Sequence, residues 1–183
     1  MSSGTPPHAY RRFPEPPMRL NLATLLIPIV MSIFSGETQA QVPVSADSLL
    51  CLTSGQLEAL YRQSIATAIP SGPIRGTALL RPGQPGAARR ARLARFAWQG
   101  KVFRDDATVV NRFFGLRAIE ARVCLGPSQL DGGPSLILDY HDTSHLYARN
   151  RDEIRQVAPG LWLGLMYEDG NPQPVLMFAL EAR

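Results

Sequence analysis

Hydrophobic residues that follow residue 50 recur first at helical spacing. Thr53 and Gln56 stand three residues apart, which is the form of a capping box at a helix start. Apolar positions then repeat every three or four residues, at Leu57, Leu60, Tyr61 and Ile65. The segment 69–73, which contains two prolines and a glycine, ends the pattern. We therefore predict one helix here.

A second helix is predicted over residues 87–97, after a short strand at 74–81 and a turn at 82–86. Its apolar residues Leu93, Phe96 and Ala97 are expected to face inward. Its arginines are expected to occupy the remaining surface.

From Trp98 onward the hydrophobic period changes from helical spacing to two, the period of a β-strand. In residues 116–125, alternate positions from Ile119 to Leu125 share the face predicted for the core, and Cys124 points away from it. Gly164 interrupts an apolar strand, which indicates a bend or a close approach of another chain segment. Residues 151–157 fit a strand or a helix. The strands predicted are 102–103, 108–114, 116–125, 135–140, 161–168 and 175–181.

Short strands separated by turns rich in Gly, Pro and Asp predict a mainly β fold. We expect an antiparallel barrel or a strongly curved sheet, with one or two helices on its N-terminal side capping one end or lying across it. Residues 41–183 are predicted to form this single β-rich domain.

Five segments of the C-terminal half resemble a set of bacterial proteins with calycin-like barrels. They read WQGKVF (98–103), LILDY (136–140), RDEIRQV (151–157), LGLMY (163–167) and MFALE (177–181). The lipocalin G-x-W signature is absent from the corresponding position. Calycins include lipocalins and fatty-acid-binding proteins, so the resemblance implies a barrel and an apolar ligand.

The N-terminal region has the layout of a secretory signal peptide. Arg19 precedes an apolar run at 20–34, and Thr38, Gln39 and Ala40 provide a small-residue cleavage site. The run is shorter than the roughly 20 residues of a spanning helix, so no stable membrane span is expected after cleavage. We predict an N-terminal extension and signal over residues 1–40, translation from Met18, and a periplasmic or secreted protein.

Charge and cysteine content refine this picture. The net charge of +4 comes almost entirely from arginine, since Lys101 is the only lysine, and no basic stripe studded with aromatics indicates nucleic-acid binding. Cys51 and Cys124 are the only cysteines. In an oxidising compartment they predict one disulfide, worth about 4 kcal/mol in the chain-entropy model. Two buried free thiols are the alternative.

The segment 139–145 holds the most concentrated polar side chains of the domain, including His141 and His145. The segment looks like a loop leaving a strand rather than a helix that presents two histidines four residues apart to a metal, and it has no G-x-S-x-G nucleophile elbow. We interpret it as an exposed loop at the mouth of a barrel. No metal, cofactor or catalytic residue is predicted, and enzymatic activity is left open.

Arg151 and Arg155 share one face if their segment is a strand, with Asp152 and Ile154 on the other. That face either lies in solvent or enters the barrel, where an arginine could bind a carboxylate. Asn111 likewise either lies in solvent or enters the barrel. The aromatic residues of the domain that carry a polar atom are expected either to line a cavity or to fill the core. The predicted ligand-binding residues are Trp98, Asn111, Tyr140, Arg151, Arg155, Trp162 and Tyr167.

The leading hypothesis is an exported barrel that binds a small apolar or amphipathic ligand such as a lipid or fatty acid. One alternative is a protein-interaction or inhibitor module of the cell envelope with a solid barrel, its partner unknown. A second is an enzyme with a polar site at the barrel mouth.

Overall fold

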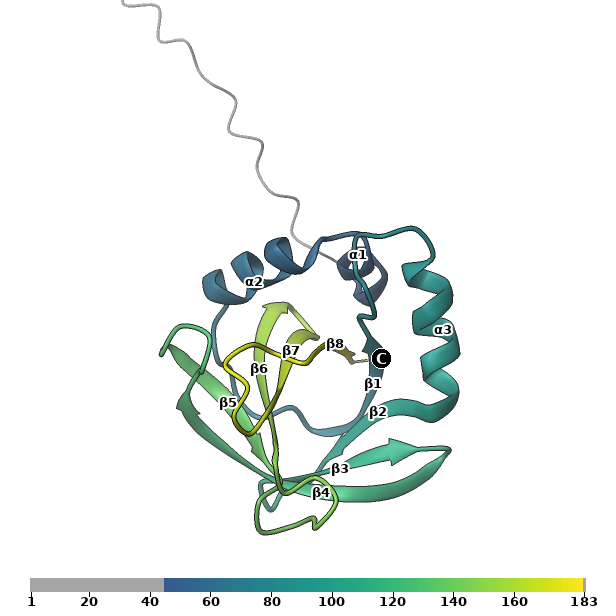
Figure 1. Cartoon of the computed structure of the whole chain (residues 1–183). Coiled ribbons are helices and arrows are strands. Elements are labelled where there is room, and N and C mark those ends of the chain that lie inside the picture. Colours follow the sequence, from purple (N-terminus) through teal and green to yellow (C-terminus); the bar gives the residue numbers. More distant parts are fainter. Residues whose placement is uncertain (1–44, 183) are drawn as a thin grey trace, which may run out of the picture. The chain divides into compact units, whose positions relative to one another are not determined.

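The computed structural model describes residues 45–182, which form a closed antiparallel barrel of eight strands. Each strand pairs with its neighbour in sequence, and β1 pairs with β8 to close the barrel (Figure 1). The mainly β fold class is thus confirmed. The strands are β1 (Gly72–Ala78), β2 (Trp98–Phe103), β3 (Thr108–Phe113), β4 (Leu116–Pro127), β5 (Pro134–Asp139), β6 (Asn150–Ala158), β7 (Leu161–Glu168) and β8 (Leu176–Glu181).

Three helices accompany the barrel: α1 (Ala46–Leu50), α2 (Ser54–Gln63) and α3 (Ala87–Ala97). The capping box of α2 is present as predicted, because Thr53 and Gln56 each bond the other's backbone N–H. The short helix α1 was not predicted; the Ser45 side chain caps its start by accepting from the Ser48 N–H. None of these helices is long and apolar enough to cross a membrane.

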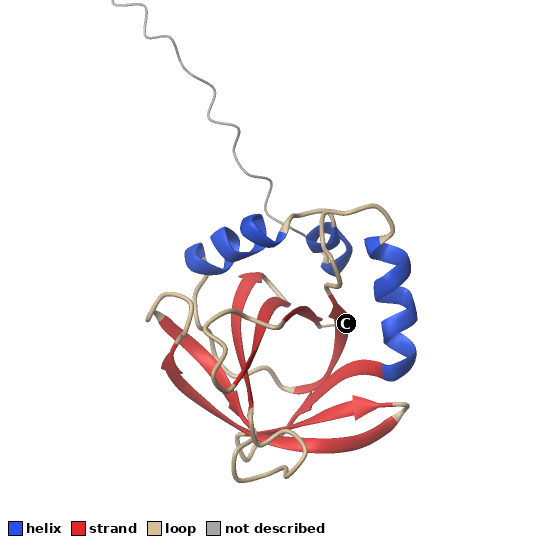
Figure 2. Ribbon diagram, viewed as in Figure 1, coloured by secondary structure: helices blue, strands red, loops and turns tan. Residues whose placement is uncertain are grey.

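The helices pack on the outer wall of the barrel rather than over its end (Figure 2). α1 contacts β8, α2 contacts β6, and α3 contacts β1 and β2. Alternating residues of β7 show why two layers form: Trp162 faces the interior, whereas Leu163 and Leu165 face outward and pack under the helices. The protein thus has two hydrophobic cores, one inside the barrel and one between barrel and helices, and residues 46–180 supply both.

The prediction of which face of α3 is buried was wrong. Ala87 and Ala91 are buried, while Leu93 and Phe96 are 61% and 74% exposed. Alanine lets the helix lie close to the wall. Arg90 fixes it there by donating to the carbonyls of residues 80, 81 and 85.

Leu125 also departs from the prediction, since it is 68% exposed although Val123 on the same face is buried. Thr108, the first residue of β3, pairs with Arg122, so beyond Arg122 β4 is flanked by β5 alone. Leu125 therefore lies past the closed part of the barrel. The segment that fitted a strand or a helix is strand β6.

Cys51 and Cys124 are free and exposed in the structure, so the predicted disulfide is not formed. Cys51 follows α1, which packs against β8. Cys124 lies on the outer face of β4, four strands away from β8 around the closed barrel. The outward direction of Cys124 was predicted correctly, but the N-terminal helices cover a different part of the wall.

Candidate functional site

A cavity of about 150 Å³ lies inside one end of the barrel. Its lining comes from the ends of β1, β3, β5 and β7 and the starts of β2, β6 and β8, which meet at the same end of an up-and-down barrel. Tyr147, from the loop between β5 and β6, adds to the lining. The lining residues are Ala78, Trp98, Lys101, Asn111, Phe113, Tyr140, Tyr147, Asp152, Met166, Leu176 and Phe178.

The opposite half of the barrel is filled by side chains. Aliphatic residues such as Val109 and Ile154 are fully buried there. Trp162 closes that end, where its indole N–H donates to Thr67 Oγ1 at 3.3 Å. The barrel is therefore solid at one end and hollow at the other.

One wall of the cavity is a buried polar cluster built around Lys101, which is only 2% exposed. Its Nζ donates to Asn111 Oδ1 at 2.8 Å, to the Tyr140 hydroxyl at 2.7 Å and to Asp152 Oδ2 at 2.8 Å. Strand alternation explains the geometry, because Lys101, Asn111 and Asp152 sit at inward positions of their strands, and Tyr140 directly follows β5. An ion pair is thereby held in an otherwise apolar interior.

The partners of Lys101 are themselves tied together. The Tyr140 hydroxyl donates to Asp152 Oδ2 at 2.8 Å. Asn111 Nδ2 donates to Tyr140 and to the carbonyl of Ile119, both at 3.1 Å. The Trp98 indole N–H donates to Asn111 Oδ1 at 3.0 Å.

These contacts use every N–H and O–H donor of the cluster. The acceptors are used unevenly. Asp152 Oδ2 accepts from both Lys101 and Tyr140, while Oδ1 is buried and accepts no hydrogen bond from the residues that the structure describes. The polar wall therefore has spare acceptor capacity and no spare donor.

Burial dominates the titration of this cluster. It lowers the pKa of Lys101, and the adjacent Asp152 carboxylate opposes that shift. Burial and the charge of Asp152 together raise the pKa of Tyr140 well above its usual value. The three acceptors around Lys101 suit an ammonium group, since a neutral amine has only two N–H donors.

The polar cluster contains no activated nucleophile. The ammonium has no free lone pair, and the Tyr140 proton is already donated to Asp152. Within residues 45–182 no group of three or more His, Cys, Asp or Glu side chains is placed to hold a metal ion.

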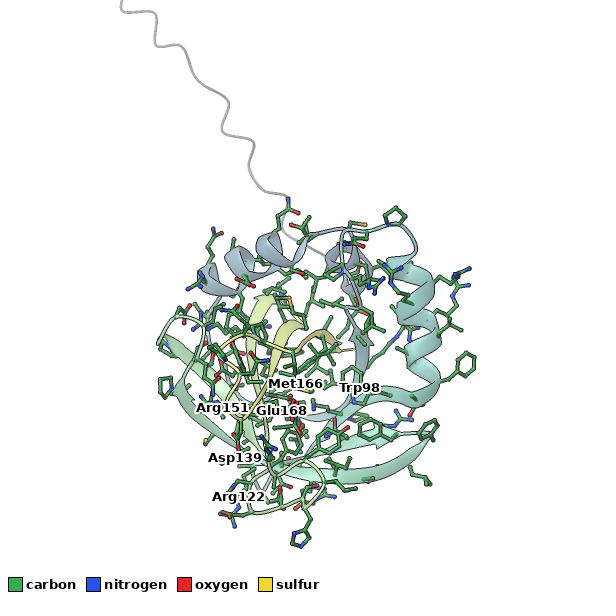
Figure 3. The ribbon with its side chains drawn as sticks, in the orientation of Figure 1. Trp98, Arg122, Asp139, Arg151, Met166 and Glu168 are labelled. Atoms are coloured by element: carbon green, nitrogen blue, oxygen red, sulfur yellow. The ribbon has the colours of Figure 1, made fainter. Side chains whose placement is uncertain are left out.

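The structure brings three of the predicted ligand-binding residues together at the cavity. Trp98 lies in β2, Asn111 in β3 and Tyr140 directly after β5, and all three belong to the polar cluster or contact it. Trp98 of β2 and Met166 of β7, both labelled in Figure 3, line the cavity.

The other four predicted residues do not line the cavity. Trp162 lies at the filled end, and Tyr167 packs outside the barrel among the helices. Arg151 and Arg155 also face outward, because Asp152 and Ile154 take the inward positions of β6. Arg155 is buried against α2 and forms a two-point ion pair with Asp131 at 2.6 and 2.8 Å, so it is committed to a structural contact.

Sequence reasoning missed Lys101 and Asp152, the charged pair at the centre of the site. Two signals were present. Lys101 is the only lysine of the chain and lies between apolar strand residues, and Asp152 shares a strand face with Ile154. The pairing itself could not be predicted, since the two residues lie on β2 and β6, which are not neighbours in the barrel.

The predicted polar loop at the barrel mouth is exposed at His141 and His145. Beside it a row of charged side chains crosses the outer wall from β4 to β6 (Figure 3). Arg122 pairs in register with Asp139, and Asp139 with Arg151. Arg151 pairs with Tyr167 on β7, and the next residue, Glu168, pairs with Asn150. Alternating charges of this kind suit a solvated surface.

Comparison with known proteins supports the fold alone. No protein-family model matches the chain, and no curated protein matches it. The chain is similar to a solved structure described as a protein from Thermomonospora curvata, with 21% identity and a TM-score of 0.50. The match covers 72% of this chain and 88% of the other. The barrel is thus shared with a known structure, and the calycin resemblance stays a prediction.

Proposed function

We propose that the protein is exported and binds one small, largely apolar molecule in the cavity at the open end of the barrel. The observation that carries this proposal is the cavity itself, whose apolar walls meet a single buried polar cluster. Pockets of this composition, with few polar groups to orient a ligand, are typical of small-molecule sites.

The volume limits the size of the ligand. A cavity of about 150 Å³ is similar in size to engineered apolar cavities that bind benzene. It lies below the roughly 300 Å³ at which drug-sized pockets begin. A long-chain fatty acid is therefore too large, and a single ring or a short branched chain fits.

The polar wall limits the chemistry of the ligand. Within the described polar cluster the unused group is the acceptor Asp152 Oδ1, so the ligand's polar group should be a hydrogen-bond donor. A carboxylate would meet the Asp152 charge and find no free donor in the polar cluster. A cation would lie next to Lys101, whose charge is already balanced by Asp152. A neutral molecule with a hydroxyl group, of which phenol is the simplest example, matches both the size and the wall.

Phenol, toluene and benzoate form a series that tests the proposal on residues 41–183, measured by isothermal titration calorimetry. Phenol is expected to bind at least about ten-fold more tightly than toluene, because a hydrogen bond to a charged acceptor contributes roughly 1.5–3 kcal/mol net. Benzoate is expected not to bind. Absence of binding by both phenol and toluene would overturn the proposed function.

A cavity-filling variant separates binding inside the barrel from binding elsewhere. Ala78 lines the cavity, so Ala78→Leu should abolish phenol binding while circular dichroism shows an intact barrel. Ala118, exposed on β4, provides the same substitution away from the cavity. Ala118→Leu is expected to bind phenol as the unaltered protein does. Equal phenol binding by both variants would place the phenol outside the barrel.

A further inference from the structure

Helix α3 ends near the turn of the β3–β4 hairpin, at the lower right of Figure 1. Four large hydrophobic side chains of these two segments are exposed. Leu93 and Phe96 come from α3 and are 61% and 74% exposed. Phe114 and Leu116 come from the hairpin and are 74% and 71% exposed. We call these four residues the apolar tip.

Backbone contacts hold the two halves of the apolar tip together. The Phe114 N–H donates to the carbonyl of Ala97, the last residue of α3, at 2.9 Å. The Gln99 side chain donates to the carbonyl of Phe96 at 2.9 Å and accepts from the Gly115 N–H at 3.0 Å. The exposed side chains therefore project from one rigid platform, not from independent loops.

The hairpin turn places its phenylalanine at an unfavourable position. Phe114 has φ +50° and Gly115 has φ +81°, the left-handed pair of a tight two-residue hairpin turn. Asn or Asp is preferred at the first of these positions, and a bulky residue there is an outlier. The exposed ring is kept despite a conformational cost, and it contributes little burial in return.

Arginines surround the apolar tip. A cleft of about 720 Å³ next to it is lined by Arg75, Arg95 and Arg112, together with the same Gln99. None of these arginines forms an ion pair with a described residue. Arg95 Nε is buried and has no hydrogen-bond partner among residues 45–182.

The charge of the cleft is only partly balanced. Burial lowers the pKa of Arg95, and the positive charges of Arg75 and Arg92 lower it further, while Asp47 and Glu181 act in the opposite direction. Helix α3 itself contains four arginines and no acidic residue. An anionic partner would relieve this repulsion.

We propose that this face docks on an anionic lipid surface, with the apolar tip inserted between headgroups and the arginine cleft against lipid phosphates. Exposed apolar side chains flanked by arginine are the pattern by which proteins bind at a membrane interface. The proposal does not depend on the barrel cavity, since all residues of the apolar tip lie outside it.

Vesicle co-sedimentation tests the proposal on residues 41–183, which hold the closed barrel, its helices and both cores. The probes are vesicles of phosphatidylcholine alone and vesicles with an equal amount of phosphatidylglycerol. Binding is expected to the second kind, because each arginine near an anionic surface contributes about a five-fold factor. That binding should weaken strongly at about 1 M salt, where the Debye length falls to about 3 Å. Equal binding to both kinds, or to neither, would overturn the proposal.

Two double variants examine the two parts of the face. Phe96→Ser/Phe114→Ser should reduce binding to anionic vesicles by about ten-fold or more, because two exposed rings no longer insert. Arg75→Gln/Arg112→Gln should reduce it by a similar factor. All four side chains lie outside the cores, so circular dichroism spectra are expected to be unchanged.

Control variants match these changes elsewhere on the surface. Leu146, 87% exposed in the β5–β6 loop, is replaced by Ser as the apolar control. Arg122→Gln/Arg149→Gln removes the same charge from other parts of the surface. Both controls should bind vesicles as the unaltered protein does, and an equal loss in the controls would refute a specific face. Loss of a dimer in Phe96→Ser/Phe114→Ser, seen by light scattering without lipid, would instead make the apolar tip a protein interface and overturn the proposal.

Discussion

Two glycines make room for the aromatic rings inside the barrel. A Cβ at Gly76 would stand 2.6 Å from the Trp98 ring, and one at Gly164 would stand 2.2 Å from the Phe178 ring. The two rings meet edge to face at 5.6 Å, and both line the cavity. The close approach predicted at Gly164 is confirmed. Its partner could not be predicted, because Phe178 faces Gly164 only once β7 and β8 pair.

Replacing Gly164 with alanine is therefore expected to destabilise the protein by about 1–3 kcal/mol, the cost of overpacking a filled interior. Gly55 provides a matched control, because it lies in α2 with nothing within 4 Å of its Cβ position. Gly55→Ala should stabilise the protein by about 0.5–1 kcal/mol through helix propensity. Urea unfolding of both variants measures the two effects. A Gly164→Ala variant as stable as the unaltered protein would show that Phe178 can move aside.

At the scale of elements, strand existence was predicted well because alternation is a local signal. The inward side of β6 was not predicted, since Arg151 to Arg155 carries charges on both faces. The structure resolves this with partners from distant elements. Buried Glu153 accepts from Ser128 Oγ at 2.6 Å, from Gln129 N–H at 2.8 Å and from Arg151 Nε at 3.1 Å. The charged outer face of β6 is therefore buried against distant partners. The local sequence pattern does not specify those partners.

Arg155 joins three elements in the same way. From β6 it donates to the Tyr61 carbonyl of α2 at 3.0 Å and to both carboxylate oxygens of Asp131 in the β4–β5 loop. It also donates to Ser135 Oγ at 2.9 Å, and its guanidinium lies 4.5 Å from the Tyr61 ring centre. The contact attaches α2 and the loop to the barrel wall.

Asp131→Asn should weaken this attachment in a pH-dependent way. Hydrogen bonds from Arg155 lower the pKa of the Asp131 carboxyl. A lowered carboxyl pKa stabilises the fold above the unfolded value of about 4, and that stabilisation is lost as pH falls through the folded value. At pH 7 the variant is expected to be about 2–3 kcal/mol less stable.

The difference should shrink once the carboxyl is protonated in both states. Urea unfolding at pH 7 and at about pH 2 measures it. Asp142→Asn, in the exposed β5–β6 loop, is the matched control and should leave stability unchanged at both values. A gap of constant size at both pH values would show that the ion pair with Arg155 is not its source.

For the whole molecule, the choice between a closed barrel and a curved sheet depended on the pairing of β1 with β8. That pairing joins residues about a hundred positions apart, such as Thr77 and Ala179, and no local pattern specifies it. The position of the helices is likewise a property of the closed barrel. The small residues of α3 and the outward-facing leucines of β7 pack into one hydrophobic core only when the strands curve into the barrel.

Closure also buries three tyrosines that respond together to alkaline pH. Burial is the main cause of the raised pKa values of Tyr61, Tyr140 and Tyr167, and for Tyr167 it gives a value of about 12. Tyr61 and Tyr167 lie in the outer core and Tyr140 in the inner one. The same property is thus distributed over both layers of the fold.

The protein is expected to lose stability as pH rises above about 10, because the unfolded tyrosines ionise there while the folded ones remain protonated. For Tyr167 the loss continues up to about pH 12, its folded pKa. Lys101 has a lowered pKa and acts in the opposite direction, but only below its usual value of about 10.5. Tyrosinate absorbance and far-ultraviolet circular dichroism, recorded across the same titration, should therefore change together for these side chains.

Tyr167→Phe tests this prediction most directly, since the buried hydroxyl of Tyr167 has no hydrogen-bond partner among residues 45–182. It should keep its stability at pH 7 and lose less of it at high pH. Complete ionisation of all tyrosines before any loss of strand signal would contradict the burial of these rings.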